Sequence, residues 1–338
     1  MQKLKNSTRI SFVGLALLAS LGLSAQALEK LPSQVPTPAD NPTTPSKVAL
    51  GKKLFFDGRL SKNGKISCNS CHDVTQTGVD GKQFSPGHDG RLGGRNSPGV
   101  FNSGFASVQF WDGRAASLEA QAKGPMTNPI EMGMENHDAV VKVLSGIPGY
   151  KKEFEKVFGP GPITIDNTVK AIAAYERTLV TPGSAYDRFV GGDTKALSES
   201  AKRGMQLVQT VGCTSCHSGA MFNGPTLPQG TGFYQKFPVI PGTEFDKKYK
   251  FTADVGRFEV TKVESDKHFF RVPTWRNVAD TAPYFHNGAV KTLNEAVVVM
   301  AKTQLNKDLA QAEVSDIVAF LKSLSGKFPK EKAPVLPQ

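Results

Sequence analysis

The chain has 338 residues, a formal net charge of +11 and a hydrophobic content of 39%, and this length suits two domains better than one large core. No basic block alternates with aromatic residues as an RNA-binding surface requires, so we expect no nucleic-acid partner. The one long apolar run, residues 10–23, is too short and too rich in small residues to span a membrane comfortably, so we expect no membrane anchor.

Residues 1–27 have the pattern of a secretory signal peptide. Three basic residues, Lys3, Lys5 and Arg9, precede the apolar run, and residues 24–27 form a small-residue cleavage pattern. We therefore expect export, with cleavage after the last of these residues. Loss of the three leader cations reduces the net charge of the mature chain from +11 to +8.

The rest of the chain predicts a mostly α protein built as two similar halves. Residues 28–46 are rich in proline, serine and threonine, and we expect them to form an extended arm. Residues 47–181 begin with a helix over 47–56 and close with an amphipathic helix over 167–179, in which apolar residues recur at helical spacing. The turn signal Thr-Pro-Gly at 181–183 marks the boundary between the halves.

Residues 182–338 repeat the same plan. A helix around 201–208 opens this half, and an amphipathic helix over 316–324 closes it. Long loops rich in glycine and proline lie between the helices, notably 76–113 and 218–258, and strand signals are weak. Loops of this length are uncommon in compact domains, so we expect a bound group to hold them in place.

Every cysteine of the chain belongs to one of two CxxCH motifs. The motifs consist of Cys68, Cys71 and His72 in the first half and Cys213, Cys216 and His217 in the second. Two cysteines three positions apart at the start of a helix reach both vinyl groups of one haem and form thioethers, and the next residue then lies under the iron as its proximal ligand. We therefore predict two covalent haem c groups, one in each half.

Other uses of paired cysteines fit these motifs less well. Four cysteines in a secreted chain usually suggest two disulfides, but here each pair is followed by histidine. A zinc site would join two CxxC units across a short loop, whereas Cys71 and Cys213 are 142 residues apart. A thioredoxin-like pair would need a single CxxC near a βαβ pattern.

Several segments beyond the haem motifs resemble the bacterial dihaem cytochrome c peroxidases. The resemblance covers nearly the whole mature chain and is carried by residues 110–114, 129–133, 271–278 and 281–288. It implies two cytochrome c-like domains, residues 47–181 with a peroxidatic haem and residues 182–338 with an electron-transfer haem. It also implies a periplasmic homodimer that reduces hydrogen peroxide to water with electrons from a small cytochrome c or a copper protein.

The residues alone leave the sixth ligand of the second haem open. The internal candidates are Met205, Met221, Met300, His268 and His286. Met300 follows a long loop, as a distal methionine should, but its apolar neighbours equally suit a core residue. The family has its axial methionine at this position, so the resemblance assigns Met300, and a thioether ligand raises the reduction potential of that haem.

The resemblance also assigns residues to the first haem site. His88 matches the histidine that caps the peroxidatic iron at rest and leaves when the other haem is reduced. Glu131 matches the catalytic glutamate that moves a proton between the two peroxide oxygens, and Gln121 is its polar companion. Trp111 matches the tryptophan that carries electrons between the haems. From the residues alone, each of these side chains could equally belong to the surface or the core.

The family further binds calcium between its domains. Asn96 matches the side-chain ligand, and Thr281 and Pro283 match the residues that supply backbone carbonyls. Neutral oxygens and water are reasonable ligands for this hard cation. The chain has no EF-hand pattern, so the expectation of calcium depends wholly on the resemblance.

Two other functions remain compatible with the sequence. Related dihaem oxygenases, which mature a tryptophan-derived quinone, carry a tyrosine at the position of Met300, and this argues against that function. A dihaem electron carrier without catalysis would need six ligands at both irons. Spectra of the half-reduced protein before and after addition of peroxide would separate the carrier from the enzyme.

Overall fold

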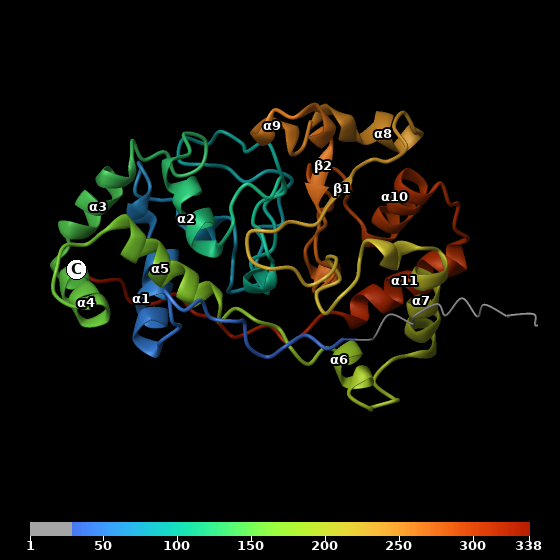
Figure 1. Ribbon diagram of the computed structural model, residues 1–338, viewed down its shortest axis with the longest axis horizontal. Coiled ribbons are helices and arrows are strands. Elements are labelled where there is room, and N and C mark those ends of the chain that lie inside the picture. Colours follow the sequence, from blue (N-terminus) through green and yellow to red (C-terminus); the bar gives the residue numbers. More distant parts are fainter. Residues whose placement is uncertain (1–28) are drawn as a thin grey trace, which may run out of the picture.

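The computed structural model describes residues 29–338, so the expected signal peptide, residues 1–27, lies outside the described residues. The described chain is mostly helical, as predicted, and forms two groups of helices with long loops between them (Figure 1). The first group consists of α1 (Pro45–Phe56), α2 (Leu118–Thr127), α3 (His137–Ser145), α4 (Pro148–Phe158) and α5 (Ile165–Glu176). The second consists of α6 (Ala185–Val190), α7 (Glu199–Thr210), α8 (Glu244–Tyr249), α9 (Phe258–Thr261), α10 (Leu293–Leu305) and α11 (Gln311–Ser323).

The opening and closing helices lie where the sequence places them, with small shifts at their ends. α1 begins two residues before the predicted start because Pro45 occupies its first turn and Thr44 caps it, accepting a hydrogen bond from the backbone N–H of Lys47. α5 ends at Glu176, three residues before the predicted end. No helix within residues 29–338 is long and apolar enough to cross a membrane.

Two short elements were not anticipated from the sequence. The strands β1 (Tyr234–Lys236) and β2 (Phe269–Arg271) pair antiparallel in the second half. The cysteine pairs lie on single 3₁₀ turns, Cys68–Ser70 and Cys213–Ser215, rather than at the start of an α-helix. Each turn ends at the second cysteine of its motif, whose backbone N–H bonds to the carbonyl of the first.

In each half the opening helix crosses the closing helix at a glycine. A Cβ atom added to Gly51 of α1 would lie 1.9 Å from the backbone oxygen of Ala171 in α5. The same addition to Gly204 of α7 would lie 1.9 Å from the backbone oxygen of Asp316 in α11. The two crossings are therefore matched, and both depend on a residue without a side chain.

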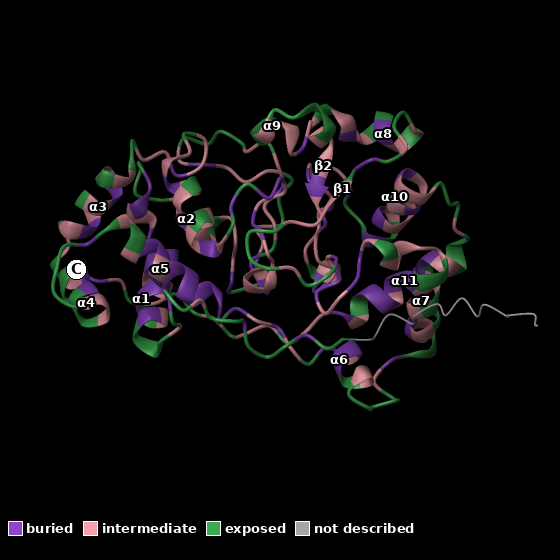
Figure 2. Cartoon of the chain, in the orientation of Figure 1, coloured by how far each residue is buried: buried purple, intermediate pink, exposed green. Residues whose placement is uncertain are grey.

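Each crossing belongs to a separate hydrophobic core. The first core surrounds α1 and α5 and includes Phe55 and Tyr175, and the second surrounds α7 and α11 and includes Phe251 and Phe320. Buried positions run along α5 and α11 on the two sides of the molecule (Figure 2). Each helix crossing thus lies in its own core, and the long loops lie between the two cores.

The terminal segments tie the two halves together. The N-terminal segment has no helix or strand from residue 29 to Thr44, and α1 begins inside the stretch expected to form the arm; the segment's Leu31 N–H donates to Asp187 in the second half, and its Asn41 donates to Glu119 in the first. The C-terminal tail returns from α11 to the first half, where Phe328 packs edge-on against a buried phenylalanine 5.1 Å away. Figure 1 shows both segments passing between the halves below the loops.

Candidate functional site

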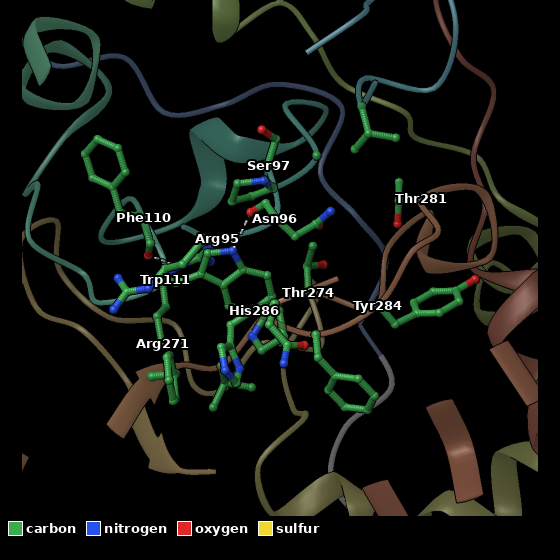
Figure 3. Close-up of a pocket in the computed structure, with 18 of the residues that line it drawn as sticks. Arg95, Asn96, Ser97, Phe110, Trp111, Arg271, Thr274, Thr281, Tyr284 and His286 are labelled. Atoms are coloured by element: carbon green, nitrogen blue, oxygen red, sulfur yellow. Dashed lines mark hydrogen bonds between the residues drawn. The ribbon is translucent and has the colours of Figure 1, made fainter. Parts of the chain in front are cut away.

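A cavity of about 1360 Å³ lies among the loops between the two halves. The cysteines and histidines of both CxxCH motifs line it, so one continuous space reaches both. The residues assigned above to catalysis, electron transfer and axial ligation that also line it are Trp111, Gln121, Glu131 and Met300. Figure 3 shows the part of this cavity where loops from the two halves meet.

The first motif presents a histidine that is ready to bind a metal. The Nδ1–H of His72 donates to the carbonyl of Pro98 at 2.9 Å, which leaves Nε2 as the free ligand atom. Burial lowers the pKa of His72, so its imidazole is neutral, as a metal ligand must be. Cys68 and Cys71 are free thiols on the adjoining turn.

The second motif has the same design with an additional aromatic wall. The Nδ1–H of His217 donates to the carbonyl of Phe222 at 2.9 Å, and burial lowers its pKa to about 4. The indole of Trp275 stacks on the imidazole with a centroid distance of 4.3 Å. Trp275 was not assigned a role from the sequence, although it lies inside the family-like segment 271–278.

Met300 lies on α10, lines the cavity and packs against the second core. Among the other candidate ligands, Met221 and His286 also line the cavity, whereas Met205 and His268 do not. The Nδ1–H of His268 bonds to the carbonyl of Asp254 instead. The assignment of Met300 as axial ligand therefore stays a prediction.

Trp111 belongs to the first half of the chain but packs against the core of the second. Its indole Nε1–H donates to the carbonyl of Asn96 at 2.8 Å, which fixes the ring plane. The ring stands edge-on to His286 at a centroid distance of 6.4 Å (Figure 3). Both residues follow a phenylalanine with positive φ, Phe110 at 68° and Phe285 at 70°, so two matching loops meet here.

Glu131 lies in a turn and lines the cavity close to Cys71 of the first motif. Its Oε1 accepts a hydrogen bond from Asn128 at 2.9 Å. Burial raises its pKa, and the positive charge of Arg114 opposes that rise. Arg114 also stacks on the ring of Phe110 at 3.5 Å and was not singled out from the sequence. A carboxyl group with a raised pKa beside a cavity suits proton transfer.

His88 lies outside the lining of the cavity. Its ring packs against Gly133, and its Nε2–H donates to the carbonyl of Pro129 at 3.1 Å. The backbone N–H of His88 donates to the carbonyl of Glu131 at 2.8 Å. The loop that carries His88 thus rests directly on the turn that carries Glu131, and the role of His88 as an iron ligand stays a prediction.

The three residues assigned to calcium come from both halves of the chain. Asn96 is buried, and its side-chain N–H donates to the carbonyl of Lys82 at 2.9 Å. Thr281 and Pro283 line the cavity alongside Asn96. Within residues 29–338 no group of three or more His, Cys, Asp or Glu side chains could hold a metal ion, so calcium here would depend on neutral oxygens.

Comparison with known proteins gives a consistent result. The model of the family "Di-haem cytochrome c peroxidase" matches residues 45–195. The cytochrome c551 peroxidase of Nitrosomonas europaea is 42% identical over 334 residues, covering 99% of this chain and 96% of the relative. The cytochrome c551 peroxidase of Pseudomonas aeruginosa is 45% identical over 317 residues, covering 93% of this chain and 88% of the relative.

A solved structure with a similar fold supports the same family. A MauG-like protein associated with microbial copper homeostasis has a TM-score of 0.76 at 29% identity, covering 88% of this chain and 95% of that one. The similarity in sequence and in structure to these relatives therefore extends over almost the whole described chain. The chain belongs to the di-haem cytochrome c peroxidase family.

Proposed function

We propose that this protein is a cytochrome c peroxidase that reduces hydrogen peroxide to water in the periplasm. Its electrons would come from a small cytochrome c or a copper protein. The observation that carries this proposal is the single cavity that reaches both CxxCH motifs and is also lined by Glu131 and Trp111. The names of its relatives in two bacteria support the same activity.

The residues of the cavity fit two haem c groups. Each motif offers two free thiols for thioether bonds and one neutral histidine whose Nδ1–H donates to a backbone carbonyl, which keeps Nε2 as the atom that can bind iron. We assign residues 47–181 to a cytochrome c-like domain for the first haem and residues 182–338 to one for the second. When bound, the haems supply the iron that meets peroxide and the redox couples that hold its electrons.

The chain itself contributes proton transfer, gating and electron routing. Glu131 accepts a proton from one peroxide oxygen at a carboxylate oxygen and returns it to the departing one, and its raised pKa places this exchange nearer to neutral pH. Gln121 lines the same space and orients the substrate by hydrogen bonding. His88 would close the first site at rest, Met300 would hold the second iron, and Trp111 would lie on the electron route between them.

The remaining parts of the proposal concern assembly and location. Residues 1–27 direct export, calcium binds at Asn96, Thr281 and Pro283, and two copies of the chain form a homodimer. Calcium at that place would join a loop of the first half to a loop of the second. The sixth ligands and the calcium site are supported by the match of single residues to the family.

The test is steady-state turnover of the purified holoprotein with a reduced small cytochrome c and peroxide. The balance of the reaction is one peroxide, two electrons and two protons to two waters. We expect two molecules of cytochrome c to be oxidised for each peroxide consumed. Peroxide left unconsumed, with both haems reduced normally, would instead identify an electron carrier.

A further inference from the structure

The matched helix crossings allow the two haem pockets to be compared residue by residue. Tyr175 of α5 and Phe320 of α11 flank the crossing glycine of their own half, at 3.0 and 2.9 Å from its added Cβ position. The next residue along each helix is therefore equivalent: Glu176 in the first half and Leu321 in the second. Both line the cavity, and both are buried, with 6% and 5% of their surface exposed.

A carboxyl group thus replaces a leucine in an otherwise equivalent position. The Oε2 atom of Glu176 is buried and has no hydrogen-bond partner among the described residues. Burial raises its pKa to about 8. An unpaired carboxyl group in the interior is costly, and such a group usually has a role that packing does not explain. Leu321 in the second pocket shows that the fold itself does not require an acid here.

Glu176 lies close to the first attachment cysteine. Burial raises the pKa of Cys68, and the charge of Glu176 raises it further. Because Cys68 is the residue that would carry the first haem, Glu176 lies where it would sense the charge of that haem. Glu176 and the first haem would interact through an apolar interior, where charges interact far more strongly than in water.

No charged group among the described residues forms an ion pair with Glu176. Arg177, the C-cap of α5, lowers the pKa of Glu176; its Nη2 donates to Glu119 of α2 at 2.6 Å, whereas its Nη1 is buried without a hydrogen-bond partner, and Glu119 in turn raises the pKa of Glu176. The lysines of α1 pair with other groups: Lys47 with Asn41, Lys52 with Glu331 and Lys53 with Glu153. On α2 and α3, Lys123 pairs with Asp166, and His137 bonds to the carbonyl of Lys123.

We propose that Glu176 is a redox-linked proton site of the first haem pocket. It takes up one proton from solvent when the first haem gains one electron, and it releases that proton when the electron leaves. One electron from the donor and one proton from water enter together, so the net charge of the buried pocket does not change. This inference rests on the proposed function only in that it places a haem on Cys68 and Cys71.

The direction of the pH dependence follows from linkage. Positive charge on the oxidised haem lowers the pKa of Glu176, and reduction removes that charge and lets the pKa rise again. Between these two pKa values the midpoint potential of the first haem falls as pH rises, by up to about 59 mV for each tenfold drop in proton concentration. Outside that range Glu176 has the same protonation state in both redox states, and the potential is flat.

The test is a spectroelectrochemical titration of each haem in the holoprotein between pH 5 and pH 9. We expect a sloping potential for the first haem, a flat one in Glu176→Gln and in Glu176→Leu, and an unchanged second haem in all three proteins. Glu131→Gln, which removes a partly buried acid that also lines the cavity beside the first motif, should retain the slope. An equal slope in wild type and Glu176→Gln, or loss of the slope in Glu131→Gln alone, would overturn the proposal.

A second measurement uses the wild-type protein and so applies even if the variants fail to retain haem. Redox-induced infrared difference spectra of the wild-type protein carrying isotope-labelled glutamate should show a protonated carboxyl band appearing on reduction. A spectrum without such a band would also overturn the proposal. Neither measurement needs peroxide, so failure of the peroxidase activity and failure of the proton site are observed separately.

Discussion

Replacement of His88 by alanine isolates the proposed gate from the structure that supports it. The change removes the imidazole but keeps the backbone N–H that donates to Glu131 at 2.8 Å, so the loop should stay on the turn below it. Among the described residues, the imidazole makes one hydrogen bond, to the carbonyl of Pro129 at 3.1 Å, and this exposed bond is lost. We expect the free energy of unfolding to fall by about 0.5–1.5 kcal/mol, the net value of one such bond.

The effect on activity should be much larger than the effect on stability. Oxidised wild-type protein should show a lag before it turns over peroxide, because the first site opens only after the second haem is reduced. His88→Ala should show no lag and a high-spin first haem in the oxidised state. His137→Ala is the matched control, because its Nε2–H also donates to a backbone carbonyl, at 3.0 Å, and His137 does not line the cavity.

Stopped-flow mixing of oxidised protein with peroxide and reduced donor measures the lag directly. A lag of equal length in His88→Ala and wild type would refute the gating role of His88. A lag lost in His137→Ala as well would show that loosening of the surface, not removal of a ligand, opens the site. Denaturant unfolding of both variants checks that their stabilities match.

Two further predictions follow from burial and packing. Burial raises the pKa of Glu131, and its ionised form must accept the proton, so turnover should fall as pH drops through that raised pKa. In Glu131→Gln this fall at acid pH should disappear, and kcat should decrease by about 10²–10⁴-fold. Profiles of rate against pH measure both effects. Gly51→Ala would place a Cβ 1.9 Å from the Ala171 carbonyl and should lower the free energy of unfolding by about 1–3 kcal/mol. The control Gly146→Ala, whose Cβ would lie 3.4 Å from its nearest neighbour, should change the free energy of unfolding by less than about 1 kcal/mol. Denaturant titrations measure both values, and equal stabilities of the two variants would contradict the importance of the glycine crossing.

Local patterns in the sequence were sufficient to predict the haem motifs and the four helices that frame them. CxxCH is a local chemical signature, and helix periodicity combined with a cap such as Thr44 locates a helix within a few residues. The strands β1 and β2 have three residues each, which is too short for alternation to be recognised. Their pairing depends on contacts between distant segments.

The site was predicted less completely because its contacts are tertiary. Trp275 could not be placed against His217 without the fold, and His88 lies against Pro129 rather than facing the cavity. The sequence pattern around Glu176 was sufficient to mark it as unusual. It lies four residues after Ile172 on the apolar face of its helix, and a charged residue on a face predicted to be buried indicates a special role.

The most direct test of the central claim is the reaction of half-reduced protein with one equivalent of peroxide. If the two motifs are a gated catalytic site and an electron store, the reduced spectrum of the second haem should vanish rapidly and the peroxide should be consumed. The first haem should be high-spin before mixing. Low-spin spectra at both haems, unchanged while peroxide persists, would contradict the account.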